Sequence, residues 1–264
     1  MSIQWSLVLF TALTGMAGWM FACVAIDCFV KKAQGANFIA SIVAFVLAAV
    51  GGLASVTHLS HPENILGALS HPTSGIFVEA VLTGIFCVSV LLFIILLKKE
   101  SEGGMKVFAI IGAIDGVALS FMAGESYMMS SQTTWNTILL PLSYFATAIP
   151  AGIGAYLVCA YAKKAEGLKL YATLLAAGAA IGAIVAAIYV LTSGNITGVA
   201  VTYFAIILVC MVIAFVIGFM LMKKESGLGL AIAAMVCAFG GAVALRCLMW
   251  IISLPTSNFF GNVL

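Results

Sequence analysis

Residues 199–224 read VAVTYFAIILVCMVIAFVIGFMLMKK, a run that carries no charge until the lysine pair at its end. A helix that crosses the hydrocarbon core of a bilayer needs roughly 20 apolar residues, so this run is long enough to span one. Seven other segments of the chain have a similar length and composition. The eight predicted spans are approximately 6–30, 36–58, 74–98, 106–130, 138–162, 168–192, 199–222 and 228–253.

The overall composition agrees with lipid as the surrounding solvent. Of the 264 residues, 64% are apolar and 8% are charged, whereas a soluble domain is roughly 45–50% apolar and roughly 25% charged. The start of the chain lacks the positive region of a signal peptide, so the first helix is expected to be retained. The sequence therefore predicts an all-α, polytopic membrane protein, with residues 1–264 forming a single membrane domain of eight transmembrane helices.

The lysines predict the orientation of this bundle. All ten lie between an odd-numbered span and the next even-numbered one, while the connections 59–73, 131–137 and 193–198 contain no Lys or Arg. The positive-inside rule places the lysine-rich loops in the cytoplasm and both termini outside, in a plasma or inner membrane. The four loops also resemble one another (KKAQGANF, KKESEGGM, KKAEGLKL and KKESGLGL), which duplication and convergence explain equally well.

Ionisable residues inside the spans are candidates for function, because burying a charge in a membrane is costly. Counted by helix rise, four of them share one depth near the outer boundary, and a fifth lies near the midplane. The four are His58, Glu79, Glu125 and Arg246, and the fifth is Asp115. Arg246 has a structural alternative, an ion pair with Glu125 or Glu79. For Asp27, near the cytoplasmic end of its helix, snorkelling or helix packing is favoured over function.

Segment 58–79 is the densest in polar groups. His58 and His61 are three residues apart and can share one helical face, and His71 and Glu79 follow. A functional interpretation makes these residues proton-transfer groups around a redox or acid–base ligand. The structural interpretation, favoured for His61 and His71, is a polar loop that caps two helices. Trp5, Trp135 and Trp250 lie near the same boundary and are expected to anchor the protein in the membrane interface.

Several kinds of site are disfavoured. Bis-histidine haem ligation needs histidines on separate helices, but all three histidines lie within 58–71. The seven cysteines are scattered through apolar segments without a CxxC pair, which disfavours an iron–sulfur cluster in this chain. The spacing of His58, His61, Glu63 and His71 matches no strong zinc pattern. No basic patch with interleaved aromatic residues suggests nucleic acid as a partner.

The same polar segment carries a family resemblance. The run His58-Leu59-x-x-Pro62, followed by Ser74 and by Glu79 at the start of the next helix, resembles the membrane-anchor subunit of dimethyl sulfoxide reductase and its relatives. The stretch from Tyr127 to Thr134-Trp135-Asn136, with Pro141 after it, is also similar. The order of eight helices with outside termini agrees, so the likeness covers nearly the whole chain.

This resemblance implies a three-part enzyme of anaerobic respiration. The anchor would oxidise menaquinol, an iron–sulfur subunit on the outer face would relay the electrons, and a molybdopterin subunit would reduce the acceptor, which the anchor does not do by itself. It implies His58 and Glu79 as catalytic residues at the quinol site. We expect Arg246, Asp115, Glu125 and His61 to contribute to binding. Relatives often have an arginine after the proline of the motif; here Glu63 and Asn64 follow, so that role is either absent or taken by Arg246.

Two other classes of function compete with this one. A transporter or channel for a small solute would use the same polar cluster as its binding site, and its signature would be broken helices in matching halves of the chain. A purely structural anchor would have polar residues that only pair with one another.

Overall fold

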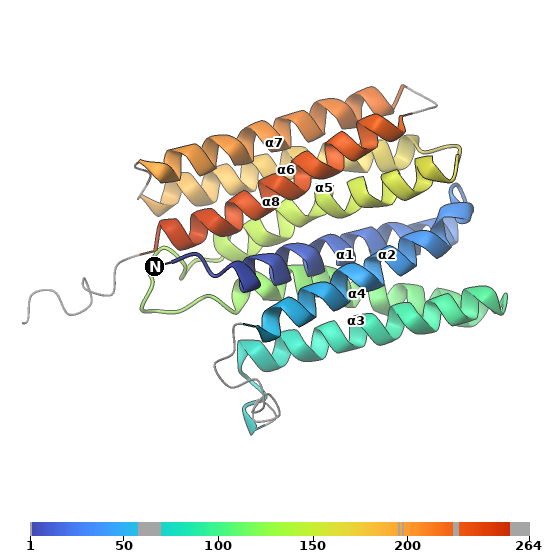
Figure 1. Cartoon of the computed structure of the whole chain (residues 1–264), viewed down its shortest axis with the longest axis horizontal. Coiled ribbons are helices and arrows are strands. Elements are labelled where there is room, and N and C mark those ends of the chain that lie inside the picture. Colours follow the sequence, from blue (N-terminus) through green and yellow to red (C-terminus); the bar gives the residue numbers. More distant parts are fainter. Residues whose placement is uncertain (1, 58–69, 195, 197, 224–226, 254–264) are drawn as a thin grey trace, which may run out of the picture.

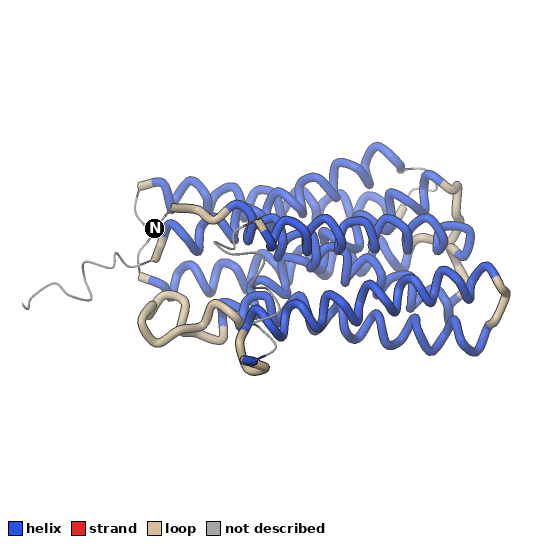
Figure 2. The backbone as a smooth tube through the Cα atoms, turned by 60° about the horizontal axis from the view of Figure 1, so that its bottom comes forward, coloured by secondary structure: helices blue, strands red, loops and turns tan. Residues whose placement is uncertain are grey.

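The computed structural model describes residues 2–57, 70–194, 196, 198–223 and 227–253. Within these ranges the chain forms eight α-helices and no strand (Figures 1 and 2). They are α1 (Trp5–Val30), α2 (Gln34–Val56), α3 (Gly75–Lys98), α4 (Glu102–Glu125), α5 (Leu139–Ala162), α6 (Lys169–Ser193), α7 (Val199–Leu221) and α8 (Leu228–Ile251). Each is long and apolar enough to cross a membrane. The chain is therefore a multi-pass membrane protein, as its sequence predicts.

Helix α4 departs most from its predicted span of 106–130, because it begins at Glu102 and ends at Glu125. Glu102 accepts a hydrogen bond from Lys106, one turn later, at 2.8 Å and also pairs with Lys31 at 3.4 Å. An acidic residue in the first turn of a helix is favourable, as is a pair of opposite charges at this spacing. These local charges explain why the helix starts before its apolar run.

The helices lie nearly side by side in two groups of four (Figure 1). In the first group, α1 and α3 each pack against both α2 and α4; in the second, α5 and α7 each pack against both α6 and α8. The groups meet mainly where α5 packs against α1 and α4. As a result, α1 and α5 are the most buried helices of the bundle.

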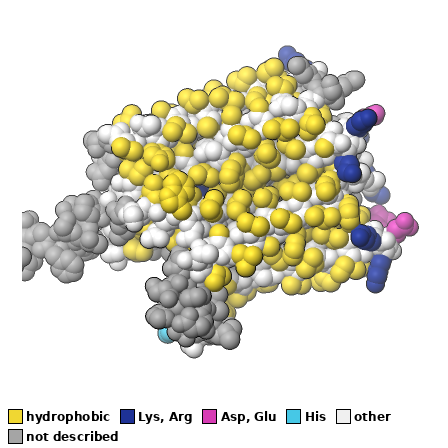
Figure 3. Space-filling view, in the orientation of Figure 1, with side chains coloured by type: hydrophobic (Ala, Val, Ile, Leu, Met, Phe, Trp, Pro, Cys, Tyr) yellow, Lys and Arg dark blue, Asp and Glu magenta, His cyan; other side chains and the backbone are white. Residues whose placement is uncertain are grey.

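The two ends of the bundle differ in charge. Lysines gather at one end, at the connections α1–α2, α3–α4, α5–α6 and α7–α8, and apolar side chains cover the flank (Figure 3). Large apolar side chains such as Leu53 and Ile114 are 70% and 67% exposed there, as expected of a surface that faces lipid. We call the charged side the lysine end. Helix α1 begins, and α8 finishes, at the opposite end.

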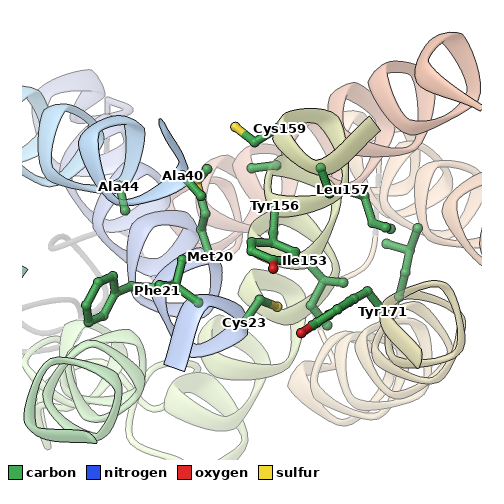
Figure 4. Close-up of a cluster of buried hydrophobic side chains, with 14 of the residues drawn as sticks. Met20, Phe21, Cys23, Ala40, Ala44, Ile153, Tyr156, Leu157, Cys159 and Tyr171 are labelled. Carbon is green, nitrogen blue, oxygen red and sulfur yellow. The ribbon is translucent and has the colours of Figure 1, made fainter. Parts of the chain in front are cut away.

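Small residues allow the central helices to approach closely. Gly18 of α1 lies against Gly116 of α4, and a Cβ at either position would overlap the backbone of the other helix. Such contacts are typical of helix association in lipid, where packing replaces the hydrophobic effect. Around this crossing lies a continuous apolar core, which includes Met20, Phe21 and Tyr156 (Figure 4).

Asp27 has a structural role at the lysine end. Its side chain is completely buried, and its Oδ1 accepts from the backbone N–H groups of Lys32 and Ala33 at 3.0 and 2.8 Å and from the Tyr171 hydroxyl at 2.8 Å. Its Oδ2 accepts from the Asn37 side chain at 3.0 Å. The carboxylate thus closes the turn between α1 and α2 and connects it to α6. The buried position rules out snorkelling and supports helix packing.

Candidate functional site

A cleft of about 750 Å³ lies at the end of the bundle opposite the lysines. Its walls come from α1, α2, α3, the segment between α4 and α5, and the end of α8. We call it the Glu79 cleft, because this carboxylate belongs to its wall. The described residues that line it are Leu7, Phe10, Gly52, Ser55, Val56, Ser74, Gly75, Ile76, Glu79, Ala80, Thr83, Gly84, Cys87, Ser126, Tyr127, Met129, Trp135 and Trp250.

Helix α3 positions Glu79 in its first two turns. The Ser74 hydroxyl caps this helix by accepting a hydrogen bond from the N–H of Phe77 at 3.3 Å. Gly75 lies directly against Ser126, which holds the start of α3 beside the segment after α4. The Glu79 side chain is only 9% exposed, and its Oε1 has no hydrogen-bond partner among the described residues. A buried carboxylate oxygen without a partner is costly, so this atom is available to a bound ligand.

Aromatic side chains form the wall of the cleft toward α8. The Trp135 and Trp250 rings meet edge to face with centroids 5.1 Å apart, and the Tyr127 ring lies 5.9 Å from that of Trp250. The Trp135 indole donates a hydrogen bond to the carbonyl of Met249 at 2.9 Å, which fixes the loop to α8. We call Tyr127, Trp135, Tyr144 and Trp250 the aromatic cluster. It offers flat apolar surfaces beside the Glu79 carboxylate.

Two of the expected interfacial anchors are in fact part of this cluster. Trp135 and Trp250 are 2% and 8% exposed, so the prediction that they anchor the protein by contact with the membrane interface is wrong. Packing against other aromatic rings holds them inside the protein. Trp5, at 55% exposure, remains at the surface, where an anchor would be.

Tyr127 brings a hydroxyl group to the cleft from outside the spanning helices. Burial raises the pKa of Tyr127 well above its ordinary value of 10.0. The hydroxyl is therefore protonated at neutral pH, and it can donate a hydrogen bond to an oxygen atom of a ligand in the cleft.

Arg246 lies behind the aromatic cluster and does not line the cleft. It is completely buried, and its Nε and Nη2 donate to the hydroxyl and carbonyl of Thr11 at 2.9 and 3.1 Å. Its Nη1 donates to the carbonyl of Ala242 at 2.9 Å. The ion pair with Glu79 or Glu125 that the sequence offered as an alternative is absent from the described part of the chain. Arg246 instead joins α8 to α1.

The other two acidic candidates lie outside the cleft. Glu125 is exposed at the last residue of α4. Asp115 is buried deeper in α4, as expected from its position, and its Oδ2 has no hydrogen-bond partner among the described residues. Cys87, at the deep end of the cleft, is close enough to Asp115 to feel its charge. The structure thus brings Glu79 and the aromatic cluster together, with Asp115 below them.

Both His58 and His61, with Glu63, lie outside the described residues. Val56, two positions before His58, lines the cleft, and α2 ends there. His71 is exposed in the turn that leads into α3. Of the described residues on either side of this segment, Val56 and Ser74 both line the cleft.

The cleft reaches the flank of the protein along α3. Ile76, Ala80 and Gly84 line it and are exposed. They are spaced by one helical turn, so they form a strip along one side of α3. Since α3 spans the membrane, this strip places part of the cleft wall at the lipid-facing flank of the protein.

The sequence did not identify Tyr144 or the role of Trp250, which lie in apolar runs without a polar pattern. In the sequence, the Tyr127 to Trp135 stretch indicates only a family resemblance and an interfacial tryptophan. The contact between Arg246 and Tyr144, with 4.4 Å between the guanidinium carbon and the ring centre, joins residues that are far apart in sequence. Only the packing of α5 against α8 shows it.

Comparison with known proteins agrees with the family resemblance that the sequence shows. The family described as DMSO reductase anchor subunit (DmsC) matches residues 1–254 of this chain. None of the curated proteins compared with the sequence matches it. Because the family match covers nearly the whole bundle, including all eight helices, this chain belongs to the family of DMSO reductase anchor subunits (DmsC).

Proposed function

We propose that this anchor subunit oxidises menaquinol in the Glu79 cleft and passes the electrons to an iron–sulfur subunit. That partner would pass the electrons on to a molybdopterin subunit, which would reduce the terminal acceptor in anaerobic respiration. The observation that carries the proposal is the Oε1 of Glu79, which has no hydrogen-bond partner among the described residues and belongs to the wall of a cleft that extends along α3. Family membership supports the partners, since an anchor subunit of DMSO reductase is by description one part of a complex.

The shape and chemistry of the cleft suit a quinol. A volume of about 750 Å³ falls within the range of roughly 300–1,000 Å³ that is usual for small-ligand pockets. Trp135 and Trp250 offer flat surfaces for a fused aromatic ring, and the exposed strip on α3 leaves room for an isoprenoid tail in lipid. Few polar groups line the cleft, so those present determine the orientation of the ring.

Oxidation of a quinol releases two protons and two electrons, and the chain must accept the protons close to the ring. The Glu79 carboxylate would accept a hydrogen bond from one quinol hydroxyl and then its proton. His58, which follows α2 by two residues in the sequence, would be the partner of the second hydroxyl. The product is the quinone, and both electrons leave to the iron–sulfur partner. The Tyr127 hydroxyl would donate a hydrogen bond to an oxygen of the ring.

The lysines support an orientation for this chemistry. If the lysine end faces the cytoplasm, as the positive-inside rule requires, the cleft lies near the outer face. The two partner subunits would then dock on the outer side, and the protons would be released there. If reduction of the acceptor also consumes protons on the outer side, the complex would move no net protons across the membrane.

The competing functions have less support. The eight described helices are unbroken, and α5 continues through Pro150, so the paired broken helices of many transporters are not found in this part of the chain. A purely structural anchor would have paired polar groups. Asp27 and Arg246 fit that description, whereas Glu79 and Asp115 each keep an oxygen that no described residue bonds.

The test is the substitution Glu79→Gln in membranes that contain the whole complex. Glutamine keeps the size of the side chain but cannot accept the proton, so oxidation of a menaquinol analogue should fall by roughly 100-fold, the contribution typical of a general base. Glu125→Gln is the matched control, because it removes an exposed carboxylate at the same end of the bundle. Retention of the partner subunits in both variants shows that the complex is intact.

An intact Glu79→Gln complex that oxidises the analogue at the rate of the Glu125→Gln complex would contradict the proposal. His58→Ala tests the second base in the same assay, and an unchanged rate would remove His58 from the site. Fluorescence quenching of a quinol analogue separates the two ways of failing. Binding without oxidation is expected for Glu79→Gln, whereas a passive anchor would bind no analogue in any variant.

A further inference from the structure

A second cleft lies at the lysine end, far from the Glu79 cleft. It has a volume of about 850 Å³ and lies among the ends of α5, α6, α7 and α8. Both the connection between α5 and α6 and the start of α8 contribute to it. We call it the Lys169 cleft.

The described charges around the Lys169 cleft are mostly positive. Lys164, Lys169 and Lys223 line it, with Glu166 as the acidic residue among the described lining residues. None of these three lysines has a carboxylate partner within the described part of the chain. By contrast, Lys31 and Lys106, in the other half of the bundle, both pair with Glu102. The cleft therefore has an excess of positive charge that its own described residues do not neutralise.

Two helices also begin at this cleft. Leu168 is the N-terminal cap of α6 and Gly227 that of α8, and neither helix start receives a hydrogen bond from a capping side chain. The free N–H groups of a helix start and the helix dipole favour an anion. Leu168 and Gly227 both line the cleft, so both helix starts lie at its wall.

A buried hydroxyl group provides independent evidence for a ligand. Tyr161 lines the cleft and is 8% exposed, yet its hydroxyl has no hydrogen-bond partner among the described residues. The hydroxyl lies beside Gly227, at the start of α8. A buried hydroxyl without a partner is costly. An acceptor oxygen bound in the cleft would satisfy it.

We propose that the Lys169 cleft binds a phosphate group, either from an anionic lipid headgroup or from solution. A phosphate oxygen would accept hydrogen bonds from the Tyr161 hydroxyl and from the helix starts, while the lysines balance its charge. Basic pockets between transmembrane helices are suited to lipid headgroups. Leu221 and Leu228, which also line the cleft, offer apolar contacts to the glycerol and first acyl carbons of a lipid. This site does not depend on the proposed quinol chemistry.

The experiment compares the purified complex in nanodiscs of mixed phosphatidylglycerol and phosphatidylcholine. Retained lipid is measured by native mass spectrometry for the wild type, Lys169→Gln/Lys223→Gln and Tyr161→Phe. The control Lys98→Gln/Lys99→Gln removes the same charge at the same end of the bundle but outside the cleft. A lysine near a charged headgroup contributes about fivefold in affinity, so the double variant should bind phosphatidylglycerol about 25-fold more weakly. The control should match the wild type.

A second arm distinguishes the source of the phosphate. In nanodiscs of phosphatidylcholine alone, inorganic phosphate should raise the thermal midpoint of the wild type and the control, but not that of the Lys169→Gln/Lys223→Gln variant, if the ligand comes from solution. Selective retention of phosphatidylglycerol identifies a lipid. If the cleft variants match the control in both arms, the proposal is wrong. Tyr161→Phe keeps every charge and should weaken binding severalfold by itself. It therefore still tests the proposal if the double variant misfolds.

Discussion

The guanidinium carbon of Arg246 lies 4.4 Å from the centre of the Tyr144 ring. Tyr144 in turn lies 6.1 Å, between ring centroids, from Tyr127, which lines the Glu79 cleft. The one arginine of the chain is therefore connected to the cleft through two aromatic rings. A cation over an aromatic face is stabilised by the electron density of the ring, which suits a buried arginine that has no ion pair with any described carboxylate. Arg246 supports the wall of the cleft from behind.

Arg246→Lys should destabilise the bundle by about 2 kcal/mol. Lysine keeps the charge but loses the planar group that bonds both oxygen atoms of Thr11 and covers Tyr144. The measurement is the thermal midpoint of the complex in detergent. Thr11→Val is the control, since it removes the hydroxyl that accepts from Arg246 and donates to the carbonyl of Leu7 but keeps the Thr11 carbonyl and the Tyr144 ring, and it should cost about 1 kcal/mol or less. Equal midpoints for wild type and Arg246→Lys would show that the contacts with Thr11 and Tyr144 contribute little.

The helices were predictable because lipid imposes a simple rule on sequence. Every spanning segment must be long and apolar, so the run 199–222 is recognisable without knowledge of its neighbours. Lysines at alternate connections mark the two ends in the same way. By contrast, Arg246 bonds to a residue 235 positions away, and Trp135 bonds to one 114 positions away. In a chain that is apolar on every face, no periodicity identifies the inner side of a helix, so these pairs appear only in the folded bundle.

The candidate site was predictable only where charge marked it. Glu79 was identified because a carboxylate inside an apolar run is rare. The same argument selected Asp27, whose oxygens are fully used by Lys32, Ala33, Asn37 and Tyr171. A carboxylate with all its hydrogen bonds and one that lacks a partner have the same residue type and similar depth in the sequence. The difference lies in the partners, which come from other helices.

Tyr127→Phe should raise the KM for a menaquinol analogue about fivefold, the effect of one lost hydrogen bond, with little change in kcat. Because burial raises the pKa of Tyr127 well above 10.0, the hydroxyl is already protonated over the working range of pH. The dependence of the rate on pH should therefore keep its shape in the variant. Tyr203→Phe, on α7 and outside the cleft, is the control and should leave KM unchanged. A shifted pH profile would mean that Tyr127 exchanges a proton during turnover.

Asp27→Asn should lower stability by about 1–3 kcal/mol while sparing quinol oxidation in the complex that assembles. The asparagine side chain has an NH2 group in place of one carboxylate oxygen. In one orientation this donor faces the Asn37 side-chain donor, and in the other it faces the donors that now bond Oδ1. Tyr171→Phe removes one hydrogen bond of the same network and should cost less. Thermal midpoints and the rate per assembled complex are the two measurements. A large loss of rate with normal stability would assign Asp27 a part in proton movement.

Ala80→Trp should block the Glu79 cleft without disturbing the bundle. Ala80 lines the cleft and is exposed on α3, so a tryptophan ring fits at this position. The ring would occupy the path by which a ligand enters the cleft from lipid. Val81, the next residue, is 41% exposed and does not line the cleft, which makes Val81→Trp a control of equal bulk. We expect oxidation of the analogue to fall roughly tenfold or more in Ala80→Trp, because small-ligand sites have little unused volume. Both variants should retain the partner subunits and the wild-type thermal midpoint. If Ala80→Trp oxidised the analogue as fast as Val81→Trp, quinol would have to enter by a route that does not pass between α2 and α3.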